Sequence, residues 1–299
     1  MFRLAHISDP HLGPLPDPSG IELASKRVLG YINWRKNRAR TLTNTFLDGL
    51  LDDMRQHSPN HIAVTGDLVN LALKAEFKPA RQWLTTLGKP ADVSVVPGNH
   101  DAYVPGALAE AERCWHDYMC GDGHPNGLRP TYPYVRIRGN VALIGVSSAR
   151  ATGPFMATGY IDSIQARHLT ELLAHLKDER LFRVVMIHHP PIRGATHWHK
   201  RLIAASRFRT AIKKSGAELV LHGHTHLATR MSLPGPEMDV PVICVPSASA
   251  SPGGRRPAAR YNLFEIDGDA GNWSCTMIER GFSQENRTEV QELGHHILL

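Results

Sequence analysis

Residues 95–101, Val-Val-Pro-Gly-Asn-His-Asp, carry an apolar strand end into a turn. The two valines predict a buried β-strand, and the Pro-Gly pair predicts a turn, since glycine bends without a Cβ clash. The turn then presents an amide, an imidazole and a carboxylate in a row. One such turn is ordinary, but the chain repeats the pattern four more times.

Four other apolar runs also end in side chains that can bind a metal. They are residues 2–11, which end in Asp-Pro-His; 61–67, which end in Gly-Asp; 182–190, which end in His-His-Pro; and 218–226, which end in His-Gly-His-Thr-His. In open α/β sheets, binding sites form in the crevice beyond the carboxyl ends of the strands. We therefore expect an α/β fold in which five strand ends converge on one site.

These motifs, in this order, resemble the signature of the calcineurin-like metallophosphoesterases: Asp-x-His, Gly-Asp, Gly-Asn-His-Asp, a later His and Gly-His-x-His. The resemblance runs from residue 4 to about residue 266. It implies a four-layer αββα sandwich, with a helical insertion after the first strand. We expect one domain over residues 1–299.

The resemblance also implies two metal ions. Their expected ligands are Asp9, His11 and His226 for the first metal, Asn99, His188 and His224 for the second, and Asp67 as the bridge between them. Ester hydrolysis needs a strong nucleophile and positive charge on the phosphoryl oxygens, and a metal pair that bridges a hydroxide supplies both. Oxygen and nitrogen ligands without thiolate suit Mn²⁺, Fe²⁺ or Fe³⁺, and Zn²⁺.

The remaining histidines near the motifs receive other roles. By resemblance, His100 is the catalytic imidazole beside the scissile phosphate, where it stabilises charge or protonates the leaving oxygen. His189 and His222 are expected to be neighbours of the ligands. His6 and His61 lie within predicted strands, so we expect them to be structural.

Three residues are candidates for substrate contact. Asn70 lies three residues after Asp67, and we expect its amide oxygen to orient the ring of His100. Arg150 and Phe155 lie in the long loop 148–160, which is either a structural lid or a substrate-binding loop. Asp101 is expected to support its own loop.

The motifs also bear on the substrate. Protein Ser/Thr phosphatases of this family carry Gly-Asp-x-x-Asp-Arg-Gly, whereas residues 66–72 read Gly-Asp-Leu-Val-Asn-Leu-Ala. The chain is most similar to the bacterial (class III) cyclic nucleotide phosphodiesterase branch. We expect a metal-dependent phosphodiesterase for cyclic nucleotides or similar small phosphodiesters. The alternatives are a nuclease, a phosphomonoesterase and a non-catalytic binding module.

The insertion at residues 22–40 is strongly basic. Its cationic residues are Lys26, Arg27, Arg35, Lys36, Arg38 and Arg40. It is either a solvated helical flap with one apolar face or a basic wall that attracts phosphates or nucleic acid. Nucleic-acid binding through it would weaken steeply with salt. A membrane-surface helix is a weaker third reading.

Composition limits further the class of protein to which this chain can belong. An apolar fraction of 42% supports a full core, and a net charge of +6 suits an anionic substrate or nucleic acid. No run of apolar residues is long enough to span a membrane. Because a strand is predicted directly after the first residue, we expect no signal peptide, and we expect the four cysteines to be reduced buried thiols. We therefore expect a cytoplasmic protein, with a homodimer as an open alternative.

Periodicity predicts the remaining elements. We expect helices at about 44–54, 74–87, 104–118, 163–176 and 206–215, and a hairpin turn at Gly139-Asn140. We expect strands at 229–233, 240–245, 261–266 and 273–279 to complete a second sheet. Residues 281–299 are expected to form a peripheral tail.

Overall fold

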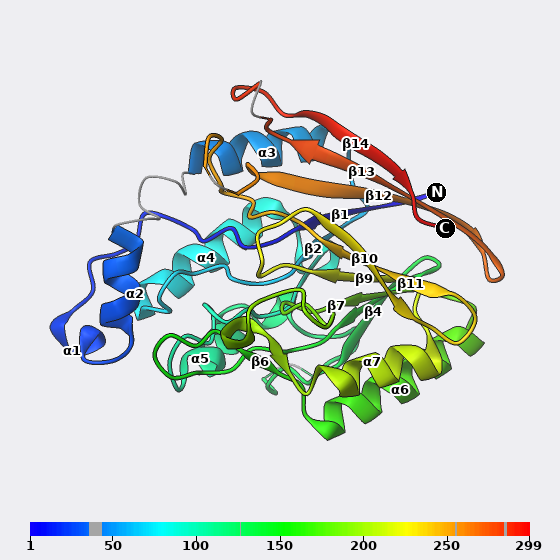
Figure 1. The fold of residues 1–299 in the computed structure, drawn as a ribbon, viewed down its shortest axis with the longest axis horizontal. Coiled ribbons are helices and arrows are strands. Elements are labelled where there is room, and N and C mark those ends of the chain that lie inside the picture. Colours follow the sequence, from blue (N-terminus) through cyan, green and yellow to red (C-terminus); the bar gives the residue numbers. More distant parts are fainter. Residues whose placement is uncertain (36–43, 126, 255, 284–285) are drawn as a thin grey trace.

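A computed structural model describes residues 1–35, 44–125, 127–254, 256–283 and 286–299. Two six-stranded sheets pack face to face, with helices on the outer face of each (Figure 1). This arrangement confirms the predicted αββα sandwich.

The first sheet has β1 near its middle. Its strand order is β14 (Gln291–Ile297), β13 (Asn272–Gly281), β12 (Arg260–Asp269), β1 (Phe2–Ile7), β2 (His61–Val64) and β3 (Val93–Val95). β1, β2 and β3 are parallel, whereas β12 runs antiparallel to β1. The expectation that β12 and β13 belong to the second sheet is therefore wrong. β12 pairs with the open edge of β1, whose backbone groups would otherwise lack partners, and β13 pairs with β12.

The tail is also more ordered than expected. β14 pairs antiparallel with β13 and forms the edge of the first sheet. Only the strand pairing, and not the polar composition of residues 281–299, reveals this element.

The second sheet contains four parallel strands flanked by two antiparallel ones. Its order is β10 (Thr229–Pro234), β11 (Asp239–Cys244), β9 (Leu219–His222), β7 (Phe182–Met186), β5 (Val141–Gly145) and β4 (Tyr134–Arg138). Arg138 pairs with Val141, so the predicted two-residue hairpin turn is confirmed. A short parallel pair, β6 (Gly159–Tyr160) and β8 (Leu202–Ile203), lies apart from the two large sheets.

Three apolar layers hold the sandwich together. The middle layer lies between the sheets and includes Leu4, Val184 and Phe264. Another apolar layer lies between the first sheet and the helices that cover it, α3 (Asn44–Gln56), α4 (Lys74–Leu87) and α5 (Ala107–Cys114). The last layer lies between the second sheet and its helices, α6 (Ser163–Asp178) and α7 (Ala205–Ser215). Each predicted helix is present, although α5 is shorter and is followed by a separate 3-10 turn, His116–Tyr118.

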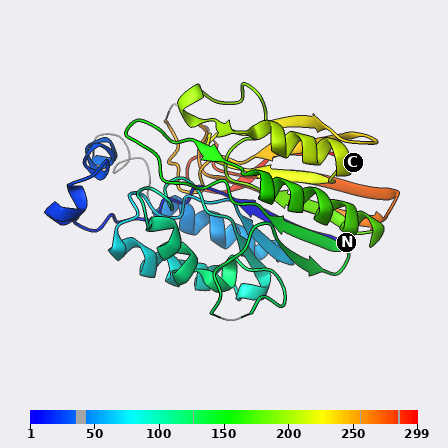
Figure 2. The same cartoon turned by 90° about the horizontal axis from the view of Figure 1, so that it is seen from below.

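The insertion forms two short helices, α1 (Gly20–Leu23) and α2 (Arg27–Asn33), that stand at one end of the molecule (Figure 2). Arg27 donates hydrogen bonds to the carbonyl oxygens of Leu71 and Ala72, which attach α2 to the loop after β2. Lys36, Arg38 and Arg40 lie outside the described residues. Among the residues described, no helix is long and apolar enough to cross a membrane.

Candidate metal centre

The loops after five strands meet at one place between the two sheets. Asp9 follows β1, Asp67 follows β2 and Asn99 follows β3, all in the first sheet. His188 follows β7 and His224 follows β9 in the second sheet. Parallel strands put all five at the same end of their sheets, as the motifs predicted.

The backbone is unusual at most of these positions. Positive φ angles occur at Asp9 (52°), His11 (42°), Asp67 (57°), His224 (67°) and His226 (56°). Non-glycine residues seldom adopt this conformation, and such residues cluster at functional sites. Here the tight turns orient the carboxylates and imidazoles so that side chains from the loops after different strands face one another.

Two glycines allow the loops to approach so closely. A Cβ atom on Gly98 would overlap the carboxylate of Asp67. A Cβ atom on Gly223 would overlap the side chains of Ser8 and Asp9. The glycines of the Gly-Asn-His-Asp and Gly-His-x-His motifs are therefore required sterically.

One group of donor atoms joins Asp9, His11 and His226. The Nε2 atom of His226 lies 2.9 Å from Oδ1 of Asp9 and 3.4 Å from Nε2 of His11. The other nitrogen of His11, Nδ1, lies 3.4 Å from the carbonyl oxygen of Val69. This contact turns Nε2 toward the group, as a carbonyl partner commonly does for a metal-ligating histidine.

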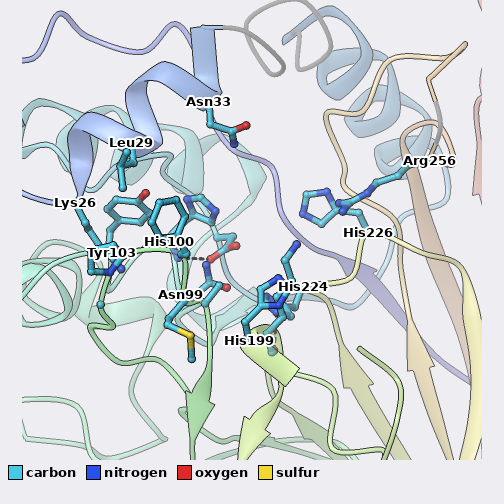
Figure 3. A pocket seen from close by; sticks show the side chains of 17 residues that line it. Lys26, Leu29, Asn33, Asn99, His100, Tyr103, His199, His224, His226 and Arg256 are labelled. Atoms are coloured by element: carbon cyan, nitrogen blue, oxygen red, sulfur yellow. Dashed lines mark hydrogen bonds between the residues drawn. The ribbon is translucent and has the colours of Figure 1, made fainter. Parts of the chain in front are cut away.

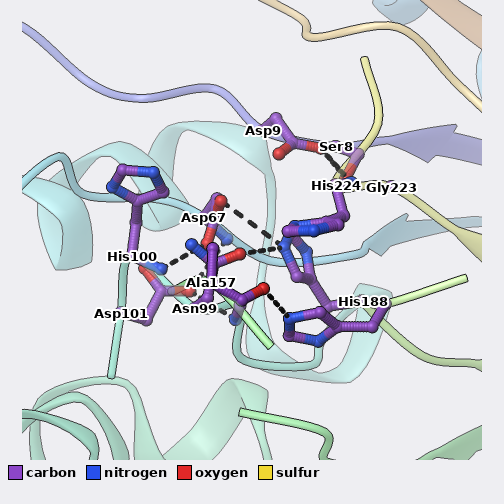
Figure 4. Close-up of polar contacts among 12 residues, drawn as sticks. Ser8, Asp9, Asp67, Asn99, His100, Asp101, Ala157, His188, Gly223 and His224 are labelled. Atoms are coloured by element: carbon purple, nitrogen blue, oxygen red, sulfur yellow. Dashed lines mark hydrogen bonds and ion pairs between the residues drawn. The ribbon is translucent and has the colours of Figure 1, made fainter. Parts of the chain in front are cut away.

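A second group joins Asp67, Asn99 and His188. The Nε2 atom of His188 lies 3.2 Å from Oδ1 of Asn99 and 3.4 Å from Oδ2 of Asp67 (Figure 4). Its Nδ1 atom donates to the carbonyl oxygen of Thr65 at 2.6 Å, which again leaves Nε2 for the site. The ring of His224 lies 5.1 Å from that of His188, and its Nε2 atom is 2.9 Å from the carbonyl oxygen of Lys200.

The donor atoms fit a pair of metal ions. Asp67 belongs to one cluster with His11 and to another with Asp9 and His188, and within each cluster all the donor atoms lie within 4.8 Å of one another. It therefore lies between the two groups, where a bridging carboxylate is needed. All donors are oxygen or nitrogen, which matches Mn²⁺, Fe and Zn²⁺.

The buried charges of the site compensate one another. Burial alone would raise the pKa of Asp67, but His188 and His100 lower it well below its usual range. Burial opposes protonation of His188, yet Asp67 and Asp9 outweigh this effect and raise its pKa to about 9. Because a bound cation competes with such a proton, metal binding here should release protons.

Two buried carboxylates hold the loop that carries Asp67. Asp101 accepts hydrogen bonds from the backbone N–H groups of Asp67, Leu68, Val69 and Gly98 at 2.8–3.2 Å. Glu76 accepts from those of Asn70, Leu71 and Leu73 at 2.6–3.1 Å. Asp101 therefore supports the neighbouring loop after β2 in addition to its own.

Asn70 does not hold His100 in the expected way. The ring nitrogen Nδ1 of His100 contacts the backbone carbonyl oxygen of Asn70, at 2.5 Å. The side-chain amide of Asn70 donates to the carbonyl oxygen of Leu12 at 2.9 Å. The prediction that the amide oxygen orients His100 is wrong, because the side chain points away toward the loop after β1.

A cavity of about 350 Å³ opens over the centre (Figure 3). Beside Asp67, Asn99, His100, His224 and His226, its lining includes Lys26 and Leu29 of the insertion, Tyr103, Phe155, Met156, His199, Lys200 and Arg256. Phe155 lines the cavity and is 82% exposed, and its contact with substrate stays a prediction. Arg150 is not part of the lining, and its guanidinium lies over the ring of Tyr160, 5.6 Å from the centroid.

Sequence reasoning missed Tyr103 and Arg256 as residues of this cavity. Tyr103 stacks on His100, with ring centroids 5.5 Å apart. Its position two residues after the Gly-Asn-His-Asp motif was the only feature of the sequence that could have indicated its role in the cavity. Arg256 lies in a loop whose course is set by tertiary packing, so nothing in the sequence pointed to it.

The other histidines near the motifs are buried, as expected. Burial lowers the pKa of His6, His61 and His189 to about 3 and that of His222 to about 4. His6 and His61 contact the hydroxyls of Thr65 and Ser94, respectively, at 2.9 and 2.8 Å. They are neutral structural residues within their strands.

The fold and the paired donor groups define a dinuclear metallophosphoesterase. A family model described as calcineurin-like phosphoesterase matches residues 2–228, and the chain belongs to that family. It is 24% identical over 240 residues to the glycerophosphodiester phosphodiesterase GpdQ of Enterobacter lignolyticus, covering 76% of this chain and 71% of that protein. A crystal structure of a dimetal phosphatase from Danio rerio has a TM-score of 0.64 at 13% identity, covering 99% of each chain, a likeness of fold alone.

Proposed function

We propose that this protein is a metal-dependent phosphodiesterase that hydrolyses small organic phosphodiesters, such as cyclic nucleotides or glycerophosphodiesters. The observation that carries the proposal is the cavity over the candidate metal centre. It combines donor atoms for a phosphate-binding metal pair with an aromatic and apolar wall made of Leu29, Tyr103, Phe155 and Met156. A diester has an organic group on each side of phosphorus, and such a wall suits one of them.

In this proposal the candidate ligands divide as the motifs suggested. Asp9, His11 and His226 would hold the first metal, Asn99, His188 and His224 would hold the second, and Asp67 would be shared by both. When bound, the pair would supply Lewis-acid charge to the phosphoryl oxygens and hydroxide at neutral pH. The distances of 2.9–3.4 Å that join His226 to Asp9 and His11, and His188 to Asn99 and Asp67, support this division. His224 is assigned to the second metal because its ring lies 5.1 Å from that of His188.

His100 acts on the leaving group. Its backbone N–H donates to Oδ1 of Asp67 at 2.7 Å, and its ring lies edge-on to that of His11, with centroids 4.8 Å apart. The imidazole thus stands beside both donor groups, at the rim of the cavity. From there it can protonate the leaving alkoxide as a general acid.

Lys26 supplies positive charge to the substrate. Its Nζ atom lies 4.3 Å from the ring centroid of Tyr103 and donates to Oγ1 of Thr152 at 3.0 Å. These contacts hold the ammonium group in the cavity wall, where it can attract an anionic diester. Arg27, by contrast, donates its hydrogen bonds to loop carbonyl oxygens. Of these two cationic residues of the insertion, Lys26 therefore lines the cavity, whereas Arg27 stabilises the fold.

The test is a substrate panel on metal-stripped protein reconstituted separately with Mn²⁺, Fe²⁺ and Zn²⁺. The panel holds a nitrophenyl diester, the matching monoester, cyclic nucleotides, glycerophosphodiesters and single-stranded DNA. We expect negligible activity without metal, and a kcat/KM for the best small diester at least about tenfold above that for the monoester. Preference for the monoester or for DNA would contradict the proposal, as would full activity in metal-free protein.

A further inference from the structure

The structure brings together another set of metal-capable side chains, separate from the candidate metal centre. His116 lies in the 3-10 turn after α5, Cys120 follows that turn, and His124 lies in the loop before β4. They are spaced as His-x3-Cys-x3-His, and their donor atoms all lie within 4.8 Å of one another. The set shares no residue with the candidate metal centre.

We infer that His116, Cys120 and His124 form a structural Zn²⁺ site. The Sγ atom of Cys120 lies 3.4 Å from Nε2 of His116. Tetrahedral zinc, with Zn–S near 2.3 Å and Zn–N near 2.0–2.1 Å, places sulfur and nitrogen ligands about 3.6 Å apart. These two side chains therefore already stand at nearly the separation that zinc requires.

The imidazole of His124, the third candidate ligand, is directed at the same place as that of His116. The carbonyl oxygen of Leu128 lies 2.7 Å from Nε2 of His116 and 3.4 Å from Nε2 of His124, so both nitrogens are directed at one oxygen atom. Two imidazoles and a thiolate make a zinc donor set, and this carbonyl or a water molecule completes the tetrahedron.

The site is reached from solvent, and the cation itself must displace the thiol proton. Burial raises the pKa of the Cys120 thiol to about 11, and the buried guanidinium of Arg136, which donates from Nε to the carbonyl oxygen of Cys120 at 2.6 Å, opposes this effect only in part. A surface cleft lined by all three candidate ligands connects them to solvent. Bound zinc would tie the loop residue His124 to the turn after α5.

Cobalt substitution tests this site independently of the phosphoesterase activity. All candidate ligands of the dinuclear centre are oxygen or nitrogen, so a thiolate-to-Co²⁺ charge-transfer band reports only on a cysteine ligand. We expect the band in the wild type and in Cys114→Ser, which removes a nearby half-buried thiol. We expect it to be lost in Cys120→Ser and weakened in His124→Gln.

Metal analysis supplies a second measurement. After saturation with Zn²⁺ and desalting, Cys120→Ser should hold about one equivalent less than Cys114→Ser, while diester hydrolysis is equal in the two variants. His124→Gln, a change in a surface loop, repeats the comparison if Cys120→Ser folds poorly. Absence of the band in wild type, or its persistence in Cys120→Ser, would overturn the inference. Neither result would bear on the dinuclear centre.

Discussion

The Nδ1 atom of His100 lies 2.5 Å from the backbone carbonyl oxygen of Asn70. A carbonyl oxygen only accepts hydrogen bonds, so Nδ1 must carry a proton. The other nitrogen, Nε2, can then donate to a leaving oxygen only when the ring is doubly protonated. The contact therefore sets both the orientation of the imidazole and the protonation state in which it can act as an acid.

Replacing His100 with Gln should impair the hydrolysis of esters with poor leaving groups most. General acid catalysis typically contributes about 10²–10⁴-fold, and a nitrophenolate leaves without that help. We expect a loss of this size in kcat for an alkyl diester and a much smaller loss for a nitrophenyl diester, at unchanged metal content. Equal losses for the two substrates would show that His100 does not protonate the leaving group.

Replacing Asn70 with Ala should leave catalysis nearly intact. The carbonyl that holds His100 belongs to the backbone, and the side chain makes its hydrogen bond to Leu12. We expect a kcat close to wild type and a free energy of unfolding lower by about 1 kcal/mol, measured by urea denaturation. Glu76→Gln, which weakens the acceptor for three N–H groups of this loop, is the comparison that should reduce kcat. A loss of activity in Asn70→Ala as large as that in His100→Gln would refute this reading.

Asp67→Asn should be far more damaging than His189→Ala. Asp67 lies between the two donor groups, whereas both nitrogens of His189 have protein partners, the hydroxyl of Ser148 at 2.8 Å and the carbonyl of Ala157 at 3.3 Å. Outer-shell changes cost about 10–100-fold, so loss of the bridge should exceed about 100-fold. Metal content measured alongside kcat separates lost binding from lost chemistry. Comparable losses in the two variants would mean that His189 is itself a ligand.

Lys26 should make substrate binding weaken at alkaline pH. Burial lowers the pKa of Lys26 to about 8, so the ammonium group is charged below this pH and loses its charge as the pH rises through it. We expect KM for an anionic diester to rise above pH 8 while kcat is little changed. Lys26→Arg keeps the charge and should remove this rise, whereas Lys26→Met should raise KM below pH 8 to about the value that the wild type reaches above pH 8. An unaltered KM profile in Lys26→Arg would assign the effect to another group.

Much of this protein follows from local sequence patterns. The apolar runs that end in Asp, Asn and His predicted the strands and the edge at which the candidate ligands meet. The periodicity of residues 74–87 and 163–176 predicted α4 and α6 with nearly correct bounds. These features are predictable because strand and helix periods, and the glycines that permit close turns, are properties of neighbouring residues.

Other features depend on which segments meet in space. The pairing of β12 with β1, and of β14 with β13, is decided by the edges that the folded sheet leaves open, because backbone hydrogen bonds are common to all residues. For the same reason, no side-chain pattern could show that a backbone carbonyl, rather than an amide side chain, holds His100. The convergence of His116, Cys120 and His124 depends on the turn after α5, since only the path of the backbone brings their donor atoms together.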